Sequence, residues 1–257
     1  MNFRNFIATG AILFLLLFVT SCASDKTILY LQDSAALNPK VQSYANVIEP
    51  DDNIAITVTA DEPELAAPFN LMYLTTKSTQ ANSSINESLM GYLVDDRGEI
   101  DFPVVGKVKL AGMTRSEAED KIKSLLRPHL ANPGVNLRIM NFKISVLGEV
   151  KAPGVQSVNG DRITVLEALS AAGDLTIYGK RDEIMVLREE GGTRTLNTID
   201  ITSTEFINSP YYYLAHNDVV YVKPNKTKIN SSIIGPNLTV GISAISLLIT
   251  IITLSTR

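Results

Sequence analysis

The chain has few of the residues from which metal sites and disulfide frameworks are built. Its 257 residues include one cysteine, two histidines and no tryptophan. A single thiol excludes a disulfide framework within the chain, and two histidines leave too few ligands for a Cys/His metal cluster. With 23 basic and 27 acidic side chains, the net charge is −4, so no basic field is present for nucleic acid. We therefore expect no metal, no cofactor and no nucleic-acid partner.

Catalytic groupings are missing as well. The sequence has no Walker-type phosphate loop and no dinucleotide-binding glycine fingerprint. His129 and His216 belong to no nucleophile or metal motif, and we predict that both lie on the surface. Two acidic clusters, at 49–52 and 95–96, suggest as an alternative the paired carboxylates of a glycan-acting enzyme. Asp in turns is the commoner use of such clusters, so we predict no catalytic residue and keep an enzyme only as an alternative.

The amino-terminal segment is typical of a secretory signal. Arg4 precedes an apolar stretch, residues 6–19, that is too short for a confident membrane span. The stretch runs into Val-Thr-Ser-Cys22, which puts the only cysteine where a signal peptide would be cut. This arrangement resembles the lipobox of bacterial lipoproteins. The resemblance implies that residues 1–21 are a signal peptide and that residues 22–43 form a tether lipidated at Cys22.

The rest of the chain alternates between strand-like and helix-like segments, which predicts an α+β fold. Two capping boxes, Thr114–Glu117 and Thr164–Glu167, predict helices that end near Arg127 and Gly173. Alternation and turn residues predict strands at 54–58, 92–94, 100–110, 135–150, 155–158, 185–187, 211–214 and 219–222. The segments at Asp52 and Asp218 share a turn, an Asp and alternating Ile/Val. This faint repeat suggests two units of related design.

Several motifs, in order, match one known family. They are 48–58, with Asp51 where the family usually has Gly, then 98–108, 112–122, 133–135, 146–154, 164–173, 178–181 and 217–224. Together they resemble the polysaccharide biosynthesis/export family, followed by a soluble-ligand-binding β-grasp (SLBB) domain. The resemblance implies an export-type N-terminal α/β domain at 44–142 and one β-grasp domain at 143–226.

The family resemblance also implies a function and partners. It implies a non-enzymatic outer-membrane lipoprotein with periplasmic domains, which forms a homo-oligomeric ring, often of eight subunits. Such a ring passes capsular or exopolysaccharide made by an inner-membrane machine, so a polysaccharide co-polymerase or export protein of that membrane is an expected partner. A membrane-anchored ligand-binding module without a pore remains an alternative, because β-grasp domains of this type are named for soluble ligands.

Three consecutive tyrosines are the one arrangement suited to sugars. Aromatic rings stack on the apolar faces of pyranoses, and a phenol can bond their edges. In a strand, Tyr211 and Tyr213 would share a face and Tyr212 would take the other. Tyr211 and Tyr213 are therefore candidate sugar contacts, with packing in the core or between subunits as the alternative.

The carboxyl-terminal segment, residues 230–257, is predicted to form a transmembrane helix. Leu238 to Leu254 is a run of 17 residues without charge, which at ~1.5 Å per residue approaches the thickness of a bilayer's hydrocarbon core. Hydroxylated residues recur on one helical face, which suggests a pore lining or a helix-packing seam, with a lone anchor as the alternative. The seam consists of Thr239, Ser243, Ser246, Thr250 and Thr253.

Overall fold

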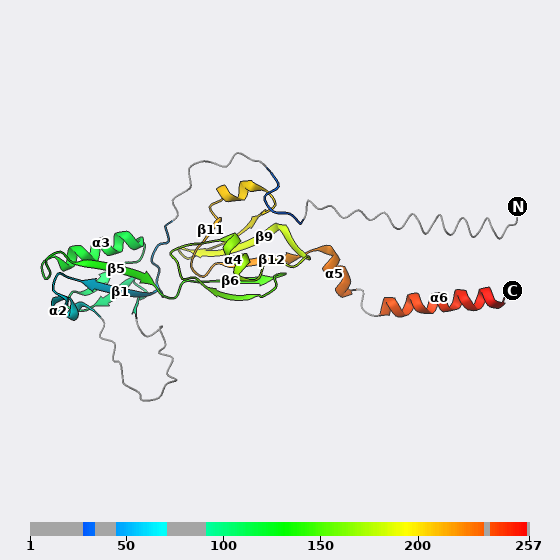
Figure 1. Ribbon diagram of the computed structural model, residues 1–257, viewed down its shortest axis with the longest axis horizontal. Helices are drawn as coiled ribbons and strands as arrows, with labels where there is room; N and C mark the ends of the chain where they lie inside the picture. The colour runs from blue at the N-terminus through cyan, green and yellow to red at the C-terminus, as the bar shows by residue number, and fades with distance from the viewer. Residues whose placement is uncertain (1–27, 34–44, 71–90, 234–236, 256–257) are drawn as a thin grey trace, which may run out of the picture.

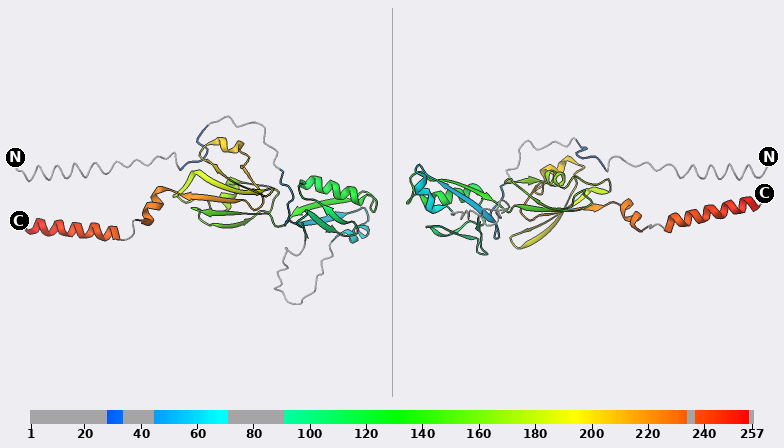
Figure 2. Two further views of the ribbon diagram at one scale, coloured as in Figure 1. Left: turned by 180° about the vertical axis from the view of Figure 1, so that it is seen from behind. Right: turned by 60° about the horizontal axis from the view of Figure 1, so that its bottom comes forward.

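The computed structural model describes residues 28–33, 45–70, 91–233 and 237–255. Figure 1 shows two strand-rich units that follow one another along the long axis, with two helices beyond the second unit. The turned views in Figure 2 keep this order. The predicted signal peptide and Cys22 lie outside the described residues. The α+β class is confirmed for the two units.

The first unit is a small antiparallel sheet covered by one helix. Its sheet has the strand order β2-β1-β5, and a separate hairpin joins β3 to β4. Alternation in β1 buries Ile54, Ile56 and Val58, and α3 buries Ala118 and Ile122 against the same core. The elements are β1 (Asn53–Thr59), α2 (Pro63–Ala66), the 3-10 helix η2 (Ala67–Phe69), β2 (Tyr92–Leu93), β3 (Glu99–Phe102), β4 (Gly106–Lys109), α3 (Arg115–Leu126) and β5 (Gly134–Ile139).

The second unit is a mixed five-stranded sheet with its own core. The strand order is β10-β9-β12-β6-β7; β12 and β6 run parallel, and the other pairs are antiparallel. Helix α4 buries Val165, Ala168 and Leu169 in this core. The elements are β6 (Lys143–Gly148), β7 (Gly154–Ser157), β8 (Ile163–Thr164), α4 (Val165–Ala171), β9 (Gly179–Glu190), β10 (Thr193–Ile199), the 3-10 helix η4 (Thr204–Asn208), β11 (Tyr213–Leu214) and β12 (Val219–Pro224).

Both predicted capping boxes are confirmed. The Glu117 N–H donates to Thr114 Oγ1 at 3.3 Å, and the Thr114 N–H donates back to the Glu117 carboxylate at 2.8 Å. The same pair of bonds joins Thr164 and Glu167, at 3.1 and 2.7 Å. Each box satisfies amide groups that have no partner inside the helix, which is why α3 and α4 begin where the sequence predicted.

The single strand predicted over 135–150 is wrong. The chain forms two strands there, β5 and β6, which belong to the sheets of different units. Between them, the Asn141 amide accepts the Asn53 N–H and donates to the Asp51 carbonyl, both at 2.9 Å, and so fixes a bend. Ile139 packs against both cores. A period of two residues shows that side chains alternate, but it does not show which sheet a strand joins.

Strand β10 was missed, and β9 is much longer than the predicted 185–187. The two strands form a hairpin whose turn is Gly191-Gly192, and both glycines have positive φ, at 57° and 76°. Positive φ at consecutive turn residues suits the right-handed twist of a hairpin. This glycine pair is the signal in the sequence that would have identified the hairpin.

Two helices follow the second unit, α5 (Lys226–Ile233) and α6 (Asn237–Ser255). Figure 1 shows them leading away at the end opposite the first unit. The expected helix near residue 238 is therefore present, and its large apolar side chains are exposed, with Leu247 at 64% and Leu254 at 76%. Within the described ranges, no helix combines the length and the apolar character needed to cross a membrane. The fold thus gives no support to the expected membrane span.

Candidate functional site

The two aspartates of the faint sequence repeat occupy the same kind of turn. Asp52 and Asp218 are both buried, and in each a side-chain oxygen accepts the N–H of the residue three positions earlier, at 2.9 and 2.8 Å. The residue before each, Asp51 or Asn217, is in the left-handed region, with φ of 69° and 62°. The repeat is therefore a repeated turn, and the acidic cluster at 49–52 serves turn chemistry. Asp95 acts likewise, since it accepts two backbone N–H groups of its own turn.

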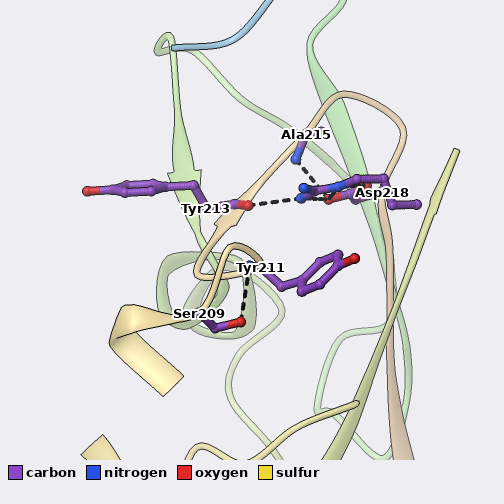
Figure 3. Close-up of polar contacts among 6 residues, drawn as sticks. Ser209, Tyr211, Tyr213, Ala215 and Asp218 are labelled. Atoms are coloured by element: carbon purple, nitrogen blue, oxygen red, sulfur yellow. Dashed lines mark hydrogen bonds and ion pairs between the residues drawn. The ribbon is translucent and has the colours of Figure 1, made fainter. Parts of the chain in front are cut away.

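A buried ion pair fixes the tyrosine segment to the sheet of the second unit. The Arg188 guanidinium donates to Asp218, with its shortest bond 2.6 Å, and also to the Tyr213 carbonyl at 2.9 Å. Its guanidinium carbon lies 5.0 Å from the centre of the Tyr211 ring. Burial raises the pKa of the Asp218 carboxyl, and the Arg188 charge opposes that rise. The arrangement around Asp218 is drawn in Figure 3.

The tyrosines do not share one strand face as predicted. β11 contains only Tyr213 and Leu214, and Tyr211 lies in the turn before it, where its N–H donates to Ser209 Oγ. Figure 3 shows the rings of Tyr211 and Tyr213 extending in different directions. Tyr211 packs beside the core, whereas the half-buried Tyr213 ring lies 5.3 Å from the Arg162 guanidinium. Their roles as sugar contacts stay predictions, but the two side chains face different surroundings.

The prediction that His216 lies on the surface is wrong. Its Nδ1 lies 2.7 Å from an Asp52 carboxylate oxygen, and both side chains are almost fully buried. The ring also meets the edge of Phe142, with ring centres 6.0 Å apart. His216 belongs to the second unit and Asp52 to the first, so this contact joins the two units. His129 is exposed, as predicted.

One carboxyl group beside this contact, that of Glu49, has a raised pKa. Glu49 is half-buried, and burial together with the nearby Asp52 carboxylate raises its pKa above the ordinary value of 4.5. Like charge and low solvation both disfavour the ionised form of an acid. Glu49 is therefore a group whose charge opposes folding at neutral pH.

A cleft lies between the two units. Its volume is about 560 Å³, and residues of both units line it. The first turn of α3 contributes Arg115, and the end of β5 contributes Arg138. The loop between β7 and β8 contributes Asp161 and Arg162, and Arg115 forms an ion pair with Asp161 across the junction at 2.9 Å. Sequence reasoning missed this cleft because its three arginines are far apart in the chain.

Two hydroxyls of the C-terminal seam, those of Ser246 and Thr250, donate to carbonyls of their own helix. Ser246 Oγ donates to the Ser243 carbonyl at 2.9 Å, and Thr250 Oγ1 donates to the Ser246 carbonyl at 2.8 Å. Such back-bonding satisfies a hydroxyl without water or a neighbour. The side chains of Thr239 and Thr253 lie outside the described set, so the seam's role remains a prediction.

Among the residues that the structure describes, no group of three or more His, Cys, Asp or Glu side chains could hold a metal ion. The buried polar groups described above are engaged in turns and unit-to-unit contacts. The fold and the cleft define the class of protein: two α+β units with a cleft that residues of both units line.

Comparison with known families gives this class a more specific description. Residues 40–140 match the polysaccharide biosynthesis/export protein family, and residues 142–222 match the SLBB domain. The chain therefore contains a polysaccharide biosynthesis/export domain followed by an SLBB domain, as the sequence motifs indicated.

Two relatives carry informative names. One is the EPS I polysaccharide export outer membrane protein EpsA of Ralstonia solanacearum, 30% identical over 192 residues, which are 72% of this chain and 50% of the relative. The protein of the same name from Ralstonia nicotianae is 29% identical over 192 residues, with the same shares of the two chains. The chain thus spans about half the length of the curated relatives it matches. Their names and the family's describe export proteins, not enzymes.

Proposed function

We propose that the chain is a non-enzymatic component of a polysaccharide export system, located at the outer membrane and assembled as a homo-oligomeric ring. The observation that carries this proposal is the ordered pair of an export domain and an SLBB domain over residues 40–222. Relatives named as outer-membrane export proteins support the same location and task. An inner-membrane polysaccharide co-polymerase is the partner that such a system needs.

Lipidation at Cys22 would hold the second unit close to a membrane. The described part of the tether adds to that unit: the Leu31 and Gln32 N–H groups donate to the carbonyls of Ile201 and Thr202, at 3.1 and 2.7 Å. Tyr30 donates its hydroxyl to Asp174 in the same unit. The six residue steps from Cys22 to Ile28 extend at most about 20 Å. A lipid on Cys22 would therefore place the SLBB unit next to the leaflet and the export unit farther away.

Helix α6 is the element best suited to hold copies together. It has no charged residue, and its described large apolar side chains are exposed and uncovered by the two units. Exposed apolar surface of this extent is costly in water. We propose that α6 helices of neighbouring copies pack side by side within an apolar, lipid-facing assembly that surrounds a pore. An anchored ligand-binding module without a pore would need no such assembly.

Genetic deletion tests this function directly. Loss of the gene should abolish surface polysaccharide, and wild-type protein supplied in trans should restore it. Cys22→Ser should fail to restore it, because the tether would lack its acyl chains. Mass spectrometry of the mature wild-type chain should show an acylated Cys22. Normal surface polysaccharide in the deletion strain would contradict the proposal.

A further inference from the structure

The cleft between the units carries an excess of positive charge on an otherwise acidic chain. Three arginines line it, Arg115, Arg138 and Arg162, and the loop of the second unit adds one carboxylate, Asp161. Asp161 is engaged by Arg115 at 2.9 Å. Within the described part of the chain, no carboxylate forms an ion pair with Arg138 or Arg162. Two guanidinium groups are thus available to an anion, although the chain as a whole has a net charge of −4.

Apolar surface lies beside these charges. Ile139 at the end of β5, and Met140 and Phe142 in the segment that joins β5 to β6, also line the cleft. The Tyr213 ring of the second unit lies 5.3 Å from the Arg162 guanidinium. Sugar rings have apolar faces that suit such surfaces, and the cleft volume of about 560 Å³ is in the range of small-ligand sites.

We propose that this cleft binds an acidic sugar unit, a pyranose that carries a carboxylate, in the polysaccharide that the protein exports. The Arg138 and Arg162 guanidinium groups bind the carboxylate, because their planar donor pairs match its two oxygens. The apolar lining and Tyr213 contact the sugar ring. This inference rests on the proposed export function and adds the chemical class of the cargo.

The cleft is well placed to contact a polysaccharide as it moves past the two units. It lies at the junction of the two units, where Arg115 and Asp161 tie their surfaces together. Arg138 and Arg162 are both exposed, so water competes for the carboxylate and binding is weak. Weak binding lets each sugar unit leave as the next arrives. Added salt would weaken it further, because exposed charges are screened.

Calorimetric titration of the full-length, detergent-extracted protein tests the proposal. The probes are trigalacturonate, neutral maltotriose and inorganic sulfate. We expect saturable binding of trigalacturonate that weakens with added salt, and no measurable binding of maltotriose. Equal affinity for sulfate would mean a general anion site and would overturn the assignment to a sugar.

Matched arginine variants locate the binding site. Arg138→Gln and Arg162→Gln should each weaken trigalacturonate binding about tenfold, the usual loss for one charge-assisted contact. Arg194→Gln is the control: it lies on the β9–β10 hairpin, is exposed and pairs with Glu189, and should bind as wild type does. Wild-type affinity in both cleft variants would overturn the proposal. Loss of binding together with a smaller oligomer in those variants would also overturn it, because the cleft would then be a contact between copies.

Different results would exclude the binding of an acidic sugar in the cleft and the proposed export function. If Arg138→Gln and Arg162→Gln together restore surface polysaccharide in the deletion strain at wild-type levels, and bind trigalacturonate as wild type does, the cleft assignment fails while export stands. If the deletion strain itself makes normal surface polysaccharide, the export function fails, whatever the titration shows. Reduced export together with tenfold weaker binding supports both.

Discussion

Asp51 occupies a backbone conformation that favours glycine. Its φ is 69°, and its side chain is exposed. A Cβ is disfavoured in this left-handed conformation, so Asp51 carries a local cost in stability that glycine would not. The turn itself is held by the Asp52 side chain, which accepts the Glu49 N–H.

Replacing Asp51 by Gly should stabilise the first unit. We expect Asp51→Gly to raise the free energy of unfolding by roughly 0.5 kcal/mol, because relief of the left-handed strain exceeds the entropy that Gly adds to the unfolded chain. Urea unfolding followed by circular dichroism measures the change. Asp96→Gly is the control, an exposed turn residue without positive φ, and it should lose stability. A loss in both variants would contradict the assignment of strain to Asp51.

Glu49 should make stability depend on pH. Its pKa in the folded state is raised above 4.5 by burial and by Asp52, so the folded state holds the proton more tightly than the unfolded state does. The stabilisation from protonated Glu49 is present below pH 4.5 and is lost as the pH rises through the folded-state pKa. Glu49→Gln should therefore be more stable than wild type at pH 7, and the difference should disappear at pH 4.

Thermal unfolding over this pH range checks the Glu49 prediction. Glu189→Gln is a matched control, because Glu189 is exposed and pairs with Arg194, and its removal should bring no gain at pH 7. A Glu49→Gln variant less stable than wild type at neutral pH would show that the attraction of ionised Glu49 to His216 outweighs its burial.

The burial of His216 could not be predicted from the sequence. Its neighbours, Ala215 and Asn217, indicate a turn, and turn residues are usually exposed. The turn is buried because the first unit packs on it, and its partner Asp52 is 164 positions away. No local pattern reports such a contact. The tyrosine segment differs from its prediction for a similar reason, since its conformation depends on the Arg188–Asp218 pair.

Helices and turns were more predictable than strand pairing. The helix starts at Thr114 and Thr164 follow from side chains within one helical turn, so the sequence contains the whole explanation. The break between β5 and β6 depends on the Asn141 amide, which reaches backbone groups about ninety positions away. Propensity and alternation do not contain that information.

The capping box at Thr164 should contribute to the stability of α4. Thr164→Ala should lower the free energy of unfolding by about 1 kcal/mol, because the Glu167 N–H in the first turn loses the Thr164 hydroxyl as its acceptor. Thr164→Ser keeps the hydroxyl and should retain most of the stability. The measurement is urea unfolding, and equal stability of the Ala and Ser variants would mean that the capping bonds contribute little.

The surroundings of α6 can be mapped with a pair of neighbouring cysteines. Ser246 lies on the hydroxyl seam and Leu247 on the apolar surface, and both are exposed in the single chain. In a ring, Ser246→Cys should crosslink between copies or react with a small water-soluble thiol reagent, because it faces a neighbour or the lumen. Leu247→Cys should do neither, because it faces lipid. Cys22 is kept in both variants. Equal reactivity at the two positions would show that α6 is not arranged about a pore.

At the scale of the whole molecule, the chain is two units held by a short junction. Ile139 packs against both cores, and the Asp52–His216 and Arg115–Asp161 contacts each join the two units. The order of the two domains was predictable from motifs, because each motif is local. The cleft between them was not, because it forms only when both units are in place.

The proposed assembly of this chain into a ring can be measured by size-exclusion chromatography with light scattering. The full-length protein, extracted in mild detergent, should elute as one species whose protein mass is a fixed multiple of the lipidated monomer's. An α6 deletion should reduce that multiple, because it removes the exposed apolar surface. If the intact, lipidated chain were a monomer at all concentrations, the proposed ring would be wrong.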